Sequence, residues 1–143
     1  MNPNTYIAKA SVTLRAPVEK VWEALTNPEI VKKYFFGTTV ESDWQVGSPI
    51  TYTGEWEGKP YTEKGIILAV EPNKQLKSTY YTASNGPDIP ENYNVITYDL
   101  RTEGASTTLQ ITQTNIKSEE SAKHSEANWN TVLAGLEKLL EQE

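Results

Sequence analysis

The chain has 143 residues, a formal charge of −6 from 13 basic and 19 acidic side chains, one histidine and no cysteine. Its length predicts one domain, residues 1–143, with a single core. The composition excludes disulfides and thiolate metal sites, predicts no metal or other cofactor, and lacks the basic patch that nucleic-acid binding needs.

The first predicted element is a strand over residues 5–14, where even positions are apolar and most odd positions are polar. A helix then begins at Pro17, because apolar residues recur at helical spacing. Asn27 should end this helix and cap a second one that has Pro28 in its first turn. We expect Gly37 to end the second helix.

The middle of the chain alternates apolar runs with the turns EGKP, EPNK and TEGAS. Strands joined in sequence by short turns are typical of an antiparallel meander and make a parallel sheet improbable. The runs that we interpret as strands span residues 50–56, 61–70, 75–81, 94–100 and 107–113.

The stretch ASNGPDIPENY, residues 83–93, has no periodicity and predicts a long loop. After it and the last strands, Ser118 is the expected N-cap of a C-terminal helix of more than five turns. Glu119 and Glu120 suit the dipole of this helix, and its apolar residues recur at helical spacing.

One strand, two short helices, six strands and one long helix form an order that resembles the helix-grip fold of the START-like superfamily, also called SRPBCC, to which the birch-pollen allergen belongs. APVEKVWEALTNPE, DWQVGSPITYTGEW, GIILAVEPNKQL and NWNTVLAGLEKLLE are similar to segments of the family named after the activator of the heat-shock protein 90 ATPase. The resemblance implies an α+β fold in which a curved antiparallel sheet wraps the C-terminal helix and leaves a cavity between them.

We expect this cavity to bind a small hydrophobic or aromatic molecule. If the first strand runs up to the helix pair, strand alternation places the helix pair, the 83–93 loop and the start of the long helix around one mouth. The expected cavity and mouth residues are Tyr34, Phe35, Phe36, Tyr52, Trp56, Ile67, Tyr80, Tyr98, Asn128, Trp129 and Leu133.

Aromatic residues at these spacings are also typical of an ordinary core. The excess of eight tyrosines over two phenylalanines favours a wet cavity, because a buried hydroxyl needs a protein, water or ligand partner. Phe35 and Phe36 cannot face the same side of a helix, so one of them is expected to be exposed.

Two other functions stay open. An enzyme of the cyclase or hydrolase type could use the same cavity, but His124 is expected on a solvated helix face, and we assign no catalytic residue. The acidic side chains could supply an acid and a base, but ordinary surface charge that keeps the protein in solution explains them equally. These residues are Asp43, Glu55, Glu57 and Glu63.

The family's name suggests a chaperone as a partner and a role in the stress response. The chain shows no signal peptide and no apolar run long enough to insert into a membrane, so we expect a cytoplasmic protein.

Overall fold

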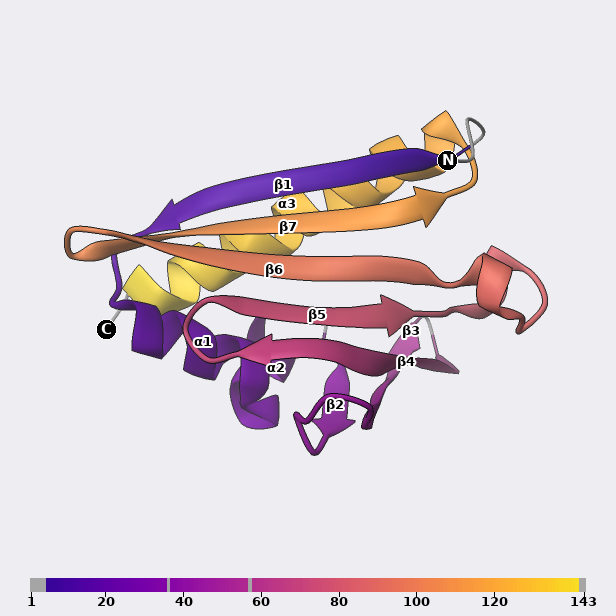
Figure 1. Ribbon diagram of the computed structural model, residues 1–143, viewed down its shortest axis with the longest axis horizontal. Coiled ribbons are helices and arrows are strands. Elements are labelled where there is room, and N and C mark those ends of the chain that lie inside the picture. The colour runs from indigo at the N-terminus through magenta and orange to yellow at the C-terminus, as the bar shows by residue number, and fades with distance from the viewer. Residues whose placement is uncertain (1–4, 36, 57, 142–143) are drawn as a thin grey trace.

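The computed structural model describes residues 5–35, 37–56 and 58–141. The predicted order of strand, two helices, six strands and long helix is confirmed (Figure 1). The helices and strands are β1 (Tyr6–Leu14), α1 (Val18–Thr26), α2 (Pro28–Tyr34), β2 (Thr39–Ser42), β3 (Pro49–Trp56), β4 (Lys59–Glu71), β5 (Gln75–Tyr80), β6 (Asn94–Glu103), β7 (Ser106–Ile116) and α3 (Glu119–Glu141). Two 3₁₀ turns, Ala83–Asn85 and Pro90–Asn92, lie between β5 and β6.

The strands form one antiparallel sheet in the order β1-β7-β6-β5-β4-β3-β2, and α3 lies across one face of it (Figure 1). This arrangement is the helix-grip fold that the order of elements predicts. The core lies between the inner face of the sheet and the helices, because every second strand residue points inward. The buried residues that α3 contributes to this layer are Ala122, Trp129, Val132, Leu133, Leu136 and Leu140.

Local chemistry sets the helix ends. Asn27 is both the C-cap of α1 and the N-cap of α2, and its Oδ1 accepts a hydrogen bond from the Glu29 amide at 3.0 Å. The Ser118 hydroxyl accepts in the same way from the Ser121 amide at 3.0 Å. Both predicted caps are confirmed. The expected end of α2 at Gly37 is wrong, because the helix stops at Tyr34 with Phe35 as its C-cap.

The expected mouth is wrong in its placement. Leu14, at the end of β1, pairs with Thr107 beside the turn at Gly104, so α1 begins at that end of the sheet. The 81–93 loop follows the pairing of Tyr80 with Asn94 and lies at the opposite end, with the start of α3 (Figure 1). The reason is that α1 and α2 carry the chain back along the sheet before β2, instead of staying where β1 ends.

Carboxylates from α3 bind one backbone amide on the open edge of β1 and one directly after its last residue. The Lys9 amide donates to Oε2 of Glu126 at 3.1 Å, and the Arg15 amide donates to Oε2 of Glu141 at 3.4 Å. These are backbone donors that β7, on the other side of β1, cannot reach. The long helix therefore packs on the sheet and also binds its edge.

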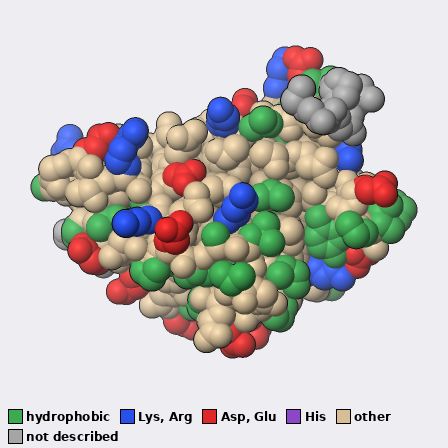
Figure 2. Space-filling model, viewed as in Figure 1, with side chains coloured by type: hydrophobic (Ala, Val, Ile, Leu, Met, Phe, Trp, Pro, Cys, Tyr) green, Lys and Arg blue, Asp and Glu red, His purple; other side chains and the backbone are tan. Residues whose placement is uncertain are grey.

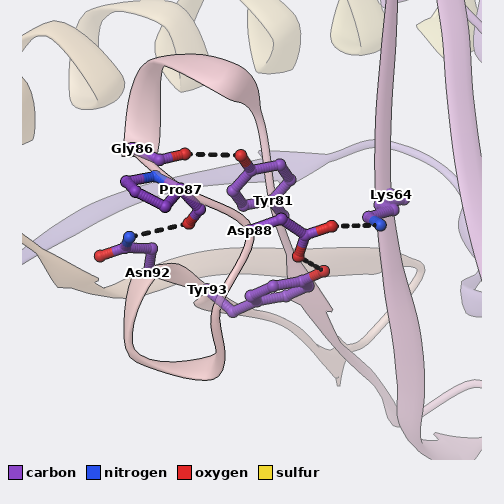
Figure 3. Close-up of polar contacts among 7 residues, drawn as sticks. All are labelled: Lys64, Tyr81, Gly86, Pro87, Asp88, Asn92 and Tyr93. Atoms are coloured by element: carbon purple, nitrogen blue, oxygen red, sulfur yellow. Dashed lines mark hydrogen bonds and ion pairs between the residues drawn. The ribbon is translucent and has the colours of Figure 1, made fainter.

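The outer face of the sheet carries scattered charged side chains, and hydrophobic side chains, Ile66 and Leu68 of β4 among them, are exposed beside them (Figure 2). The 81–93 loop is fixed beside this face by its own side chains (Figure 3). Asp88 receives a hydrogen bond from Tyr93 and an ion pair from Lys64 on β4, while the Tyr81 hydroxyl donates to the carbonyl of Gly86. The loop is thus an ordered part of the fold.

Candidate functional site

A cluster of aromatic rings occupies the inner face between the sheet, α2 and α3. Phe35, directly after α2, stands at its centre, with its ring 6.4 Å from that of Tyr52 and 5.7 Å from that of Trp129. Tyr98 packs edge-on against Trp129 at 6.0 Å, and Tyr80 packs edge-on against Tyr52 at 5.8 Å. The fold therefore brings together rings from five separate parts of the chain.

A small cavity of about 20 Å³ lies beside this cluster. Space of that size holds about one water molecule. Side chains thus fill most of the interior beside the ring cluster. Its lining residues are Leu25, Val31, Tyr34, Phe35, Val40, Trp44, Ile50, Tyr52, Leu76 and Tyr98.

Burial controls the chemistry of the inward tyrosines. It raises the pKa of Tyr34, Tyr52 and Tyr98 well above 10, so these hydroxyls stay protonated at neutral pH. The Tyr34 hydroxyl donates to the carbonyl of Ala24 at 2.7 Å, which ties α2 to α1. In the described part of the chain, every buried polar side-chain atom has a partner. The tyrosine hydroxyls by themselves therefore do not require a ligand.

A more polar region adjoins the rings on β4. Glu63 lies directly opposite Tyr52 in the β3–β4 register, so its side chain points to the inner face. Tyr61, two residues earlier on the same face, shares a 2.6 Å hydrogen bond with the Thr38 hydroxyl. Burial and the Glu63 carboxylate raise the pKa of Tyr80. Glu63, Tyr61 and Tyr80 are only half-buried, so this end of the cluster is reached by solvent.

A hydrogen-bond chain leads from the rings to the 81–93 loop. Trp129 donates from its indole nitrogen to Oε1 of Gln113 at 2.9 Å, and Gln113 donates to Oδ1 of Asn94 at 3.1 Å. Asn85 in the loop donates to the same Asn94 oxygen at 3.0 Å. Both Gln113 and Asn94 are buried. The loop that lies far from the cavity is thus connected to it through the core.

The structure places the expected site residues as follows. Tyr34, Phe35, Tyr52, Tyr80, Tyr98 and Trp129 belong to the ring cluster, while Ile67 and Leu133 are fully buried core residues. Asn128 is wrongly expected beside the cavity: it is exposed, because one helical residue turns it about 100° from the buried Trp129. Phe36 and the side chain of Trp56 lie outside the described residues.

Sequence reasoning missed the inward position of Glu63, although its alternation with Tyr61 and Ile67 carried the signal. His124 is exposed, as expected. Within residues 5–35, 37–56 and 58–141, no group of three or more histidine or acidic residues could hold a metal ion. None of the helices described is long and apolar enough to span a membrane.

Comparisons with known proteins agree on the family. The family model described as "Activator of Hsp90 ATPase homolog 1-like protein" matches residues 15–141. The solution structure of ChR145 from Cytophaga hutchinsonii is 48% identical, with a TM-score of 0.82 over 96% of this chain and 94% of that one. No curated protein matches the chain.

More distant solved structures share the fold. Protein MLL2253 from Mesorhizobium loti is 23% identical, with a TM-score of 0.80 over 96% of this chain and 98% of that one. The Aha1 dimer from Colwellia psychrerythraea is 22% identical, with a TM-score of 0.76 over 95% and 96% of the two chains.

Proposed function

Because the chain belongs to the family of activator of Hsp90 ATPase homolog 1-like proteins, we propose that it binds a small hydrophobic or aromatic molecule between its sheet and its helices. The observation that carries the proposal is the ring cluster around Phe35 with a cavity beside it. Apolar walls with a few polar groups at one end are the usual composition of small-molecule sites. We assign the protein to the cytoplasm.

A ligand larger than water requires the site to open. The cavity of about 20 Å³ is bounded on one side by α2 and Phe35 and on the other by the sheet. α2 has seven residues and Phe35 is half-buried, so moving them away from the sheet breaks fewer packing contacts than moving α3 would. We therefore assign ligand entry to a movement of α2 and Phe35 away from Tyr52 and Trp129.

The test is a titration of the labelled protein with flavonoid-like, lipid and aromatic compounds, followed by amide chemical shifts. We expect saturable shifts at Val31, Phe35, Tyr52 and Tyr98, which line the cavity. Shifts confined to the outer-face residues Thr108 and Gln110 would serve as the control for nonspecific binding. If no compound of the library shifts the cavity residues saturably, the proposal is overturned.

A chaperone is a second candidate partner, supported by the description of the matching family. The measurement is the ATPase turnover of a bacterial ninety-kilodalton chaperone with and without this protein, together with a pull-down. Faster turnover would support this role. Unchanged turnover at saturating protein would reject it and leave ligand binding in place.

A further inference from the structure

Glu63 is a charged residue on the face of the sheet that forms the core. Its partner across the β3–β4 register is Tyr52, which is 6% exposed, and Ile67 on the same face of β4 is fully buried. Glu63 itself is half-buried, and a positive partner would stabilise a carboxylate that is partly shielded from water. None of the ion pairs among the described residues involves Glu63. In the described part of the chain, the Glu63 carboxylate thus faces the core side of the sheet without an ion-pair partner.

Three tyrosines lie on the same face of the sheet as this carboxylate. Tyr80 and Tyr52 meet edge-on at 5.8 Å, and Tyr61 lies two residues before Glu63 on the same face of β4. Gly54 makes room for Tyr61, because a Cβ at that position would lie 2.5 Å from the Tyr61 hydroxyl oxygen. The Thr38 hydroxyl holds the outer end of the Tyr61 ring. The rings are fixed by packing, and the region stays half-open to solvent.

A carboxylate among aromatic rings is the combination that recognises organic cations, through charge and through the negative faces of the rings. A neutral aromatic ligand would gain only the rings, and an anionic one would be repelled by Glu63. We propose that the ligand of this site is an arylalkylamine, an aromatic ring that carries an alkylammonium group, whose protonated nitrogen binds Glu63 among Tyr52, Tyr61 and Tyr80, while its ring enters the cluster at Phe35. This inference rests on the proposed function and names its ligand class.

Three indoles of similar size test the inference: tryptamine as the cation, tryptophol as the neutral analogue and indole-3-propionate as the anion. Dissociation constants come from amide shifts of the wild-type protein at neutral pH. We expect tryptamine to bind about tenfold more tightly than tryptophol, the value of one charge-assisted hydrogen bond, and indole-3-propionate to bind most weakly.

The variant Glu63→Gln keeps the size of the side chain but removes the charge, and should abolish the preference for tryptamine. Glu55→Gln is the matched control, because Glu55 is exposed on the neighbouring strand and its loss changes the net charge equally. That variant should keep the preference. Thermal melting of both variants checks that the fold is retained.

Equal binding of tryptamine and tryptophol to the wild type would overturn the inference, and so would a preference that survives in Glu63→Gln. Either result leaves the proposed function standing if the neutral indole still shifts the cavity residues. Absence of saturable shifts with tryptamine also overturns the inference, whatever the wider compound library binds.

Discussion

The indole nitrogen of Trp129 donates a hydrogen bond to Oε1 of Gln113 inside the core, at 2.9 Å. Gln113→Leu should destabilise the protein by about 2 kcal/mol, because the indole N–H and the Asn94 side chain lose a buried partner. Urea unfolding measures the change. Gln110→Leu, on the exposed face of the same strand, is the control and should shift stability by less than about 0.5 kcal/mol.

The same pair predicts non-additivity. Trp129→Phe removes the donor and part of the ring, and in that background Gln113→Leu no longer orphans the indole N–H. The double variant should therefore lose less stability than the sum of the two single variants. Strict additivity would show that the hydrogen bond contributes nothing.

Phe35→Ala should enlarge the cavity between α2 and the sheet. We expect a loss of about 2 kcal/mol, below the usual range for a fully buried ring because Phe35 is only half-buried. The variant should also bind benzene or indole, as apolar cavities of sufficient size do. Calorimetry or amide shifts detect the binding. Val46→Ala, at a residue 68% exposed, should change neither stability nor binding.

Two glycines should respond oppositely to alanine. A Cβ on Gly65 would lie 1.8 Å from the backbone oxygen of Thr79, so Gly65→Ala should cost about 3 kcal/mol or more. A Cβ on Gly135 of α3 would meet Tyr34 at an ordinary 3.5 Å, and Gly135→Ala should stabilise the helix by about 0.5–1 kcal/mol. Thermal unfolding measures the change in stability of both variants. If both variants were stabilised, or both destabilised, the packing described would be contradicted.

The ion pair and the hydrogen bond of Asp88, which together anchor the 81–93 loop, should depend on pH. The Lys64 ammonium and the Tyr93 hydroxyl lower the pKa of Asp88 below its usual 3.8. The anchor is therefore fully present above the unfolded pKa and is lost as pH falls through the lower folded value. Amide shifts of Tyr93 and Asp88 between neutral pH and pH about 2 follow the loss. Asp88→Asn should remove this transition; if it persists, another group causes it.

The inward tyrosines should resist alkali. Burial raises the pKa of Tyr34, Tyr52, Tyr80 and Tyr98 above the usual 10. Their contribution to stability is complete below pH 10 and falls as pH rises beyond it, because only the unfolded chain ionises them readily. Absorbance at alkaline pH should show these four of the eight tyrosines titrating only as the protein unfolds. Ionisation of all eight in the folded state would contradict their burial.

Local chemistry made much of this fold predictable from the sequence. Asn27 and Ser118 cap helices through atoms that lie within three residues of them, so their effect is visible in the sequence itself. The alternation of apolar residues located the longer strands for the same reason. The ring cluster followed from placing these alternating faces against one cavity.

Long-range pairing limited the prediction. β2 has four residues, too few for a clear alternation. The order of elements predicts this strand, but the sequence pattern does not give its residues. The path of α1 and α2 along the sheet depends on the pairing of β1 with β7, which are far apart in sequence. Because glutamate side chains are usually exposed, we interpret Glu63 from the sequence as a surface charge, although the alternation along β4 places it on the inner face.

The carboxylates on the edge of β1 have a consequence for behaviour at high concentration. An uncovered nine-residue strand would be a template for a strand of another molecule. The Glu126 side chain occupies one of its donors, Glu141 binds the amide of Arg15 directly after its last residue, and both add negative charge there. The opposite edge, β2, has four residues. Growth of the sheet into fibrils is thus opposed at the β1 edge by acidic side chains and at the β2 edge by the short length of that strand.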